Sequence, residues 1–220
     1  MARMRTAVLV SGRGSNMAAL LDAAADPSFP AEIVLVLSNR PDAGGLARAA
    51  AAGVPTAVAD HRAYADRAAF EAAMQAQLEQ ADVELVCLAG FMRVLTPWFI
   101  NRWPERLVNI HPSLLPAYRG LHTHERALAD GVRIHGCTVH LVVPELDAGP
   151  IIAQAAVPVH AADTPDTLAA RVLAAEHRLY PLALSWLASG RVRHEAGRLI
   201  VDATETGGML LSPGCLPDQG

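Results

Sequence analysis

Short, uninterrupted apolar segments alternate with helical segments through the first half of this 220-residue chain. Strand-like segments lie at 7–10, 33–37, 56–59, 85–89 and 107–110, with helix-like segments at 17–25, 45–52 and 64–80 between the first four. Strands that are apolar throughout are buried on both faces, and a strand–helix–strand order produces parallel pairing. The pattern predicts an α/β fold: a mostly parallel twisted sheet with helices on both faces and a Rossmann-like N-terminal half.

The second half changes character. Longer strand-like segments at 138–143 and 151–159 are followed by a helical segment at 164–188 and a hairpin-like segment at 192–201. Thr164-Pro165 is a typical helix start, and Pro181 predicts a kink or a break inside that helix. Because no repeat or linker is evident, we expect one domain at 1–202, followed by a loose tail at 203–220.

Composition and charge exclude several classes of protein. A hydrophobic fraction of 52% predicts a globular chain, and a net charge of −4 argues against a nucleic-acid binder. The first apolar segment is too short for a secretion signal, and none approaches the roughly 18 residues of a membrane span. Cys87 and Cys137 have no CxxC spacing, which favours buried free thiols in a reducing compartment. We therefore expect a cytoplasmic protein that binds neither nucleic acid nor membranes.

A glycine-containing loop, Ser11-Gly-Arg-Gly-Ser-Asn16, connects the first predicted strand to the first predicted helix. Glycines permit a tight turn there, and the helix N-terminus offers free N–H groups to an anion. The loop matches neither the dinucleotide-binding pattern nor the P-loop pattern. It is therefore either an ordinary capped turn or a site for the phosphate of a small substrate.

Asn109 and His111 stand two positions apart at the end of a predicted strand, before Pro112. The strand repeat of two places both side chains on one face, where an amide and an imidazole can stabilise an oxyanion and move a proton. Asp147 lies in a predicted turn between two strands. It either bonds its own turn or orients and charges His111, and sequence spacing does not decide between these roles.

Other polar residues have an ordinary explanation beside a functional one. Histidines at 122, 124, 135 and 140 lack metal-ligand spacing, so we predict no metal site and instead a loop of polar histidines near an active site. Glu176 in the long helix would by default be solvated. Residues 91–95 follow a strand end and would by default pack in the core, although an apolar run with one arginine also suits a flat ligand bearing a carboxylate.

From residue 5 to residue 190 the chain resembles the glycinamide ribonucleotide formyltransferase family, the folate-dependent transferases of purine synthesis. The resemblance rests on motifs in matching order and spacing: SGRGSN at 11–16, SN at 38–39, LAGFMR at 88–93, LVNIHPSLLP at 107–116, GLHTH at 120–124, HGCTVH at 135–140 and ELDAGP at 145–150.

The resemblance implies transfer of the formyl group of 10-formyltetrahydrofolate, the cosubstrate, to the amine of glycinamide ribonucleotide. Asn109, His111 and Asp147 would be catalytic: Asn109 and protonated His111 would bind the oxyanion, and Asp147 would favour the imidazolium. Substrate-binding residues would be Gly14, Ser15, Asn16 and Glu176. Folate-binding residues would be Arg67, Met92, Arg93, Val94, Leu95, Asn109, His140 and Val143.

Four alternatives compete with this interpretation. A 10-formyltetrahydrofolate hydrolase would carry an extra N-terminal domain and lack the phosphate loop, and a methionyl-tRNA formyltransferase would carry a basic C-terminal domain. A non-catalytic folate-binding protein would not require Asn109, His111 and Asp147 together. A Rossmann oxidoreductase would require a different glycine pattern. The sequence leaves open whether the chain is a monomer or a homodimer.

Overall fold

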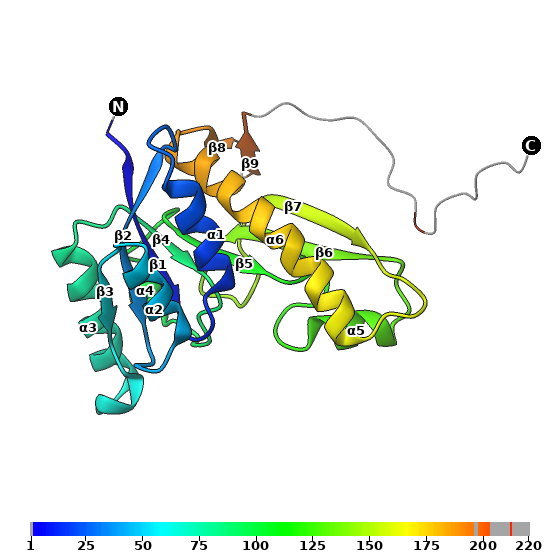
Figure 1. The fold of residues 1–220 in the computed structure, drawn as a ribbon, viewed down its shortest axis with the longest axis horizontal. Helices are drawn as coiled ribbons and strands as arrows, with labels where there is room; N and C mark the ends of the chain where they lie inside the picture. Colours follow the sequence, from blue (N-terminus) through cyan, green and yellow to red (C-terminus); the bar gives the residue numbers. More distant parts are fainter. Residues whose placement is uncertain (1, 196–197, 203–211, 213–220) are drawn as a thin grey trace, which may run out of the picture.

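A computed structural model describes residues 2–195, 198–202 and 212 of the chain. Its main sheet has seven strands in the spatial order β3-β2-β1-β4-β5-β6-β7 (Figure 1). The strands are β1 (Met4–Val10), β2 (Ala31–Ser38), β3 (Thr56–Val58), β4 (Leu85–Leu88), β5 (Leu107–His111), β6 (Ile134–Leu141) and β7 (Ile151–Pro158). Strands β1 to β5 pair in parallel, whereas β6 is antiparallel to both β5 and β7. The predicted mostly parallel α/β sheet is confirmed.

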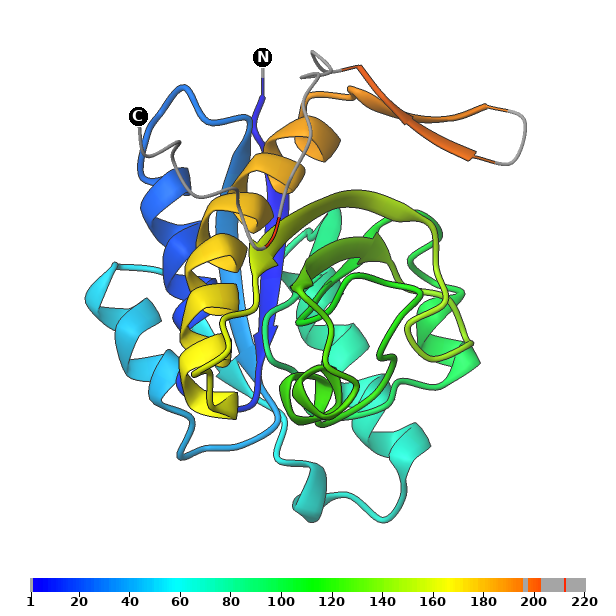
Figure 2. The same ribbon diagram turned by 90° about the vertical axis from the view of Figure 1, so that its right-hand side faces the viewer.

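Helices cover both faces of this sheet (Figure 2). The helices are α1 (Ser15–Ala24), α2 (Gly44–Ala51), α3 (Arg67–Gln80), α4 (Pro97–Ile100), α5 (Thr123–Ala129) and α6 (Pro165–Ala188). Alternate strand residues divide between two cores: Val8 and Val10 pack with α1 and α6, whereas Ala7 and Leu9 pack with α3 and α4. This division explains why the strands are apolar at every position.

The strand order changes direction at β1: the strands that follow β1 in sequence are added first on one side, as β2 and β3, and then on the other, beginning with β4. The chain leaves β1 at Ser11 and leaves β4 at Ala89, so both connections begin at the same edge of the sheet. Open α/β sheets bind ligands at such a switch point, outside the carboxyl ends of the strands. The helices return antiparallel to the strands, so the N-termini of α1 and α3 also lie at this edge.

Several predicted boundaries need correction. The helix predicted at 64–80 begins at Arg67, because Asp66 accepts the Ala69 N–H as its N-cap, and a short 3-10 turn, η1 (His61–Ala63), precedes it. Strand β6 covers Ile134–Leu141 rather than 138–143. Helix α6 continues through Pro181, because the buried faces on either side of the proline hold it against the sheet. The sequence did not predict α4 or α5.

Strands β8 (Val192–Glu195) and β9 (Arg198–Val201) form the predicted hairpin, whose turn at 196–197 lies outside the described residues. So does the tail predicted at 203–220, apart from Ser212. Cys87 and Cys137 are buried free thiols, as predicted, and burial raises the pKa of each to about 12. No helix in the described part of the chain combines the length and apolar character needed to span a bilayer.

Candidate active site

Asn109 and His111 lie at the end of β5, as the sequence predicts. Leu107 packs in the core beneath α3 and α4, whereas Val108 and Ile110 pack in the other core, so Asn109 and His111 share the face of Leu107. Strand β5 ends at His111, immediately before Pro112. His111 is only 5% exposed, so protein groups rather than water surround its ring.

The two ring nitrogens of His111 have different partners. Nε2 lies 2.9 Å from the carbonyl oxygen of Tyr118, which accepts hydrogen bonds only, so Nε2 carries a proton and donates it. Nδ1 lies 3.5 Å from Oδ2 of Asp147. Nδ1 is therefore the ring nitrogen that faces the Asp147 carboxylate.

Asp147 is fixed by the backbone around it. Its φ of +48° lies in the left-handed region, and its Oδ2 accepts the Gly120 N–H at 2.9 Å. Two residues later, a Cβ on Gly149 would lie 1.8 Å from the Leu141 carbonyl oxygen, so only glycine permits this close approach to β6. The structure thus directs the Asp147 carboxylate to His111 and Gly120, and among the described residues it makes no hydrogen bond within its own turn.

His140 lies opposite Asn109 in the β5–β6 ladder. Its Nδ1 lies 2.9 Å from its neighbour's carbonyl, that of Leu141, so Nδ1 carries the proton and Nε2 is left as an acceptor. Burial lowers the pKa of His140, which favours the neutral ring. The Asn109 amide donates to this Nε2 at 3.3 Å, and its second N–H remains available to another acceptor.

The loop after β1 leads directly into α1. Gly14 stands at the N-cap with a φ of +71°, and a Cβ there would lie 2.8 Å from the Gly45 backbone, so this position requires glycine. Because no side chain caps the helix, the backbone N–H groups of its first turn are available to an anion. This geometry suits a phosphate at Gly14, Ser15 and Asn16.

Glu176 is buried rather than solvated. It is 6% exposed on α6, and its Oε2 accepts a hydrogen bond of 2.7 Å from the Asn16 side chain. Burial raises the pKa of Glu176, and the bond from Asn16 partly opposes this shift. The structure therefore joins two of the predicted substrate-binding residues, although they are 160 positions apart in the chain.

The predicted folate-binding residues differ in how much of their surface is exposed. Met92 and Val94 expose 67% and 60% of their surface, whereas Leu95 is buried in the core beneath α3 and α4. Arg93 and Val143 are half-buried. Arg67 is exposed in the first turn of α3, and within the described residues no hydrogen bond or ion pair joins it to the others.

The predicted histidine loop is in part the start of α5, which begins at Thr123. The rings of His124 and His135 meet edge to face with centroids 5.3 Å apart. Burial lowers the pKa of His124, and it lowers the pKa of His135 to about 4. Both pKa shifts favour the neutral form of the ring. Over the described ranges, no group of three or more His, Cys, Asp or Glu side chains is placed to hold a metal ion.

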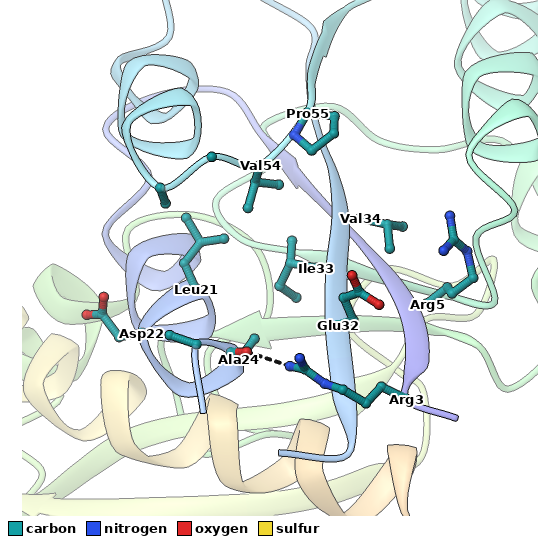
Figure 3. Close-up of a pocket in the computed structure, with 13 residues that line it drawn as sticks. Arg3, Arg5, Leu21, Asp22, Ala24, Glu32, Ile33, Val34, Val54 and Pro55 are labelled. Atoms are coloured by element: carbon teal, nitrogen blue, oxygen red, sulfur yellow. Dashed lines mark hydrogen bonds between the residues drawn. The ribbon is translucent and has the colours of Figure 1, made fainter. Parts of the chain in front are cut away.

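A separate pocket of about 610 Å³ lies at the opposite edge of the sheet, near the starts of β1 and β2 (Figure 3). None of the predicted site residues lines it. Arg3, which borders it, donates to the carbonyls of Ala24, Phe29 and Ala31 and so holds the end of α1 against β2. The Arg3 guanidinium therefore stabilises the fold. The candidate site lies at the other edge of the sheet, at the carboxyl ends of the strands.

Sequence reasoning missed the groups that orient the predicted catalytic side chains. The Tyr118 and Leu141 carbonyls and the Gly120 N–H are backbone atoms, which carry no sequence signal. It also missed the pairing of Asn109 with His140, which depends on the register of two strands.

Comparisons with known proteins agree with this geometry. Residues 4–184 match the family of formyl transferases. The phosphoribosylglycinamide formyltransferase of Escherichia coli is 46% identical over 193 residues, which cover 87% of this chain and 91% of that protein. The bovine trifunctional purine biosynthetic protein adenosine-3 is 50% identical over 90% of this chain, but the match spans only 20% of that longer protein.

Solved structures agree as well. The phosphoribosylglycinamide formyltransferase of Brucella melitensis is 51% identical, with a TM-score of 0.84 over 96% of this chain and 99% of that chain. The glycinamide ribonucleotide transformylase 1 of Symbiobacterium toebii is 46% identical, with a TM-score of 0.88 over 90% and 94% of the two chains. With its site geometry, its fold and these relatives in agreement, the chain belongs to the formyl transferase family, among the phosphoribosylglycinamide formyltransferases.

Proposed function

We propose that this protein transfers the formyl group of 10-formyltetrahydrofolate to the amine of glycinamide ribonucleotide, as a step of purine biosynthesis. The observation that carries the proposal is the placement of Asn109, His111 and Asp147 in one cluster at the carboxyl edge of the sheet, where α1 also offers an uncapped N-terminus. Its relatives carry that activity in their names.

Attack of the substrate amine on the formyl carbon forms a carbon–nitrogen bond and turns the formyl oxygen into an oxyanion. Protonated Nδ1 of His111 and the free N–H of Asn109 donate to that oxygen. Both donors are fixed before the substrate arrives, His111 by Tyr118 and Asn109 by His140, so little reorganisation accompanies the reaction.

Asp147 supports the charge on His111. Its Oδ2 faces Nδ1 at 3.5 Å while the Gly120 N–H holds the same oxygen. The carboxylate thereby stabilises the imidazolium and accepts, through water, the proton that the attacking amine must lose. When the intermediate collapses, the bond from the formyl carbon to the folate nitrogen breaks, and that nitrogen takes up a proton.

The two substrates reach this centre from different elements. Gly14, Ser15 and Asn16 bind the ribonucleotide phosphate at the start of α1, and Glu176 accepts hydrogen bonds from the ribose hydroxyls. The folate occupies the side formed by residues 92–95, His140 and Val143, where Met92 and Val94 present apolar surface. Arg67 supplies a more distant anion contact.

A hydrolase that releases formate is the second candidate, because water in place of the amine needs the same Asn109, His111 and Asp147. The uncapped start of α1 and the Asn16–Glu176 pair favour the transferase, since a hydrolase has no phosphate or ribose to bind. A non-catalytic folate-binding protein would not need these catalytic groups.

We also infer that residues 1–202 act as one domain, with the phosphate bound by the N-terminal half and the folate by the C-terminal half. The protein would act in the cytoplasm as a monomer or homodimer, without a metal and without nucleic acid or membrane partners.

The proposal is tested with 10-formyltetrahydrofolate that carries carbon-13 in its formyl group. With the wild-type protein, nuclear magnetic resonance should show the label on the amine nitrogen of the ribonucleotide. With Asn109→Ala, that product should form at least about 100-fold more slowly, because an oxyanion donor is lost. Label that appears only as free formate would overturn the transferase assignment.

A further inference from the structure

The Ser11 side chain joins the two loops that leave the switch point of the sheet. Ser11 directly follows β1 and is 6% exposed. Its hydroxyl accepts the Met92 N–H at 2.8 Å and donates to Oδ1 of Asn39 at 2.5 Å. Its backbone N–H donates to the Gly90 carbonyl at 3.2 Å. Ser11 thus makes three hydrogen bonds with residues far from it in sequence.

These bonds connect the proposed phosphate loop to the proposed folate segment. On one side, Ser11 is followed by Gly12, whose carbonyl accepts the Gly45 N–H at 3.0 Å. On the other side, Met92 begins the segment 92–95, whose far end is held by Glu71 through the Thr96 N–H at 2.8 Å. A shift of the phosphate loop therefore displaces the acceptor of the Met92 N–H.

We propose that Ser11 is a positioning residue that couples the two substrate sites, so that a phosphate bound at the start of α1 increases the affinity for folate at residues 92–95. The proposal rests on the assignment of ligands under the proposed function. Ser11 touches neither substrate in it. The hydroxyl acts by setting where the backbone of the folate segment lies.

The coupling arises because both ligands order residues that are joined through Ser11. Binding of a phosphate to the N–H groups of Ser15 and Asn16 restricts residues 12–14, and with them the orientation of the Ser11 hydroxyl. The Met92 N–H then meets an acceptor that is already in place, so folate binding pays less for ordering this segment. Coupling between sites is commonly about 5- to 150-fold in affinity, and one hydrogen bond corresponds to the low end of this range.

Ser38 provides a matched control. It is a fully buried serine at the end of the neighbouring strand β2, and its hydroxyl bonds only within its own turn, to the Arg40 carbonyl at 2.8 Å and the Arg40 N–H at 3.0 Å. Ser38→Ala removes the same chemical group from a similar environment. It leaves the connection between the two loops intact.

The experiment is calorimetric titration of the full chain with tetrahydrofolate, with and without saturating glycinamide ribonucleotide, because this pair forms a complex without reacting. For the wild type and Ser38→Ala, the ribonucleotide should tighten tetrahydrofolate binding about 5-fold. Thermodynamic reciprocity requires tetrahydrofolate to tighten ribonucleotide binding by the same factor. For Ser11→Ala, both ratios should fall to about 1, while each ligand alone still binds.

Coupling that persists in Ser11→Ala, or that is absent from the wild type, overturns the proposal while the formyl-transfer activity stands. Failure of the wild type to bind either ligand overturns the proposed function and the coupling with it. If Ser11→Ala does not fold, Ser11→Cys fills a similar volume with a weakly bonding thiol. Coupling of wild-type size in that folded variant would contradict the proposal.

Discussion

The orientation of the His111 ring is set by the two groups on either side of it. The Tyr118 carbonyl fixes the proton on Nε2, and the Asp147 carboxylate faces Nδ1. A ring held in this way presents Nδ1 in a fixed direction. The alternation of side chains along β5 places that ring on the same face as the Asn109 amide.

Replacement of His111 by alanine should reduce kcat by about 10²- to 10⁴-fold, the usual contribution of a positioned acid–base group. Folding should persist, because β5 keeps its ladder with β4 and β6. Steady-state kinetics and circular dichroism would test this. The matched control is His160→Ala, which removes an exposed histidine before α6 and should leave kcat unchanged. A near-normal rate for His111→Ala would exclude the mechanism.

The buried His135 makes folding dependent on pH. Burial lowers its pKa from 6.5 to about 4, so between these values the unfolded chain binds the proton more strongly than the folded protein does. Its contribution to stability is complete above pH 6.5 and is lost as the pH falls towards 4, by roughly 1–3 kcal/mol.

Urea denaturation from pH 4 to pH 7 measures this dependence. The free energy of unfolding of the wild type should rise with pH across the range, and the rise should be smaller for His135→Gln. Glu176 acts in the opposite sense, since its raised pKa lowers stability as the carboxyl ionises, so the difference between the two proteins isolates His135. Equal slopes for the two proteins would show that His135 is not the source.

At the scale of single elements, the turn between β6 and β7 holds the Asp147 carboxylate, for which we propose a catalytic role. Gly149 passes so close to the Leu141 carbonyl that a methyl group there must move the chain. Gly149→Ala should therefore displace Asp147, lower kcat at least about 10-fold and cost about 1–3 kcal/mol of stability. Gly131→Ala is the control, since a Cβ at that positive-φ glycine meets no atom within 4 Å. It should cost stability without lowering kcat. Full activity in Gly149→Ala would contradict the role of this turn.

Helices α1 and α6 meet through the Asn16–Glu176 bond. Asn16→Ala should raise the KM for the ribonucleotide at least about 10-fold and leave the KM for the folate nearly unchanged, because a buried carboxylate loses its donor on the phosphate side. Glu79→Ala breaks a similar amide–carboxylate bond in α3, from Gln75 at 2.9 Å, and should change neither constant. A rise in the KM for folate alone would mean that this pair serves the folate, and an equal rise in both KM values would contradict its assignment to the ribonucleotide.

Elements with a strong local signal were predictable. The apolar strands and the Thr164 helix start depend on neighbouring residues, so their positions follow from the sequence to within a few residues. Strand β6 was predicted to begin four residues too late, because His135 and Gly136 are not typical of a strand. The close approach of the Ala155 carbonyl nevertheless requires a glycine at position 136. The unbroken α6 depends on tertiary packing, which outweighs the local cost of Pro181.

At the scale of the whole molecule, the site is assembled from segments that are far apart in the chain. His111 and Asp147 were each recognisable, but their contact depends on how β5, β6 and the turn after β6 pack together. Local patterns do not encode such distances, so the residues alone gave this contact only as one of two roles for Asp147, and the resemblance to the family favoured it. The fold places an uncapped helix start and an imidazole–carboxylate pair at one edge of the sheet, which suits a reaction of two substrates.

The central claim is that deformylation of the folate requires the ribonucleotide amine. The measurement that tests it most directly is the absorbance change of 10-formyltetrahydrofolate mixed with purified protein, in the presence and absence of glycinamide ribonucleotide. The account predicts deformylation only when the ribonucleotide is present. Deformylation at the same rate without it would identify a hydrolase, and no deformylation in either mixture despite bound folate would identify a binding protein. Either result would contradict the account.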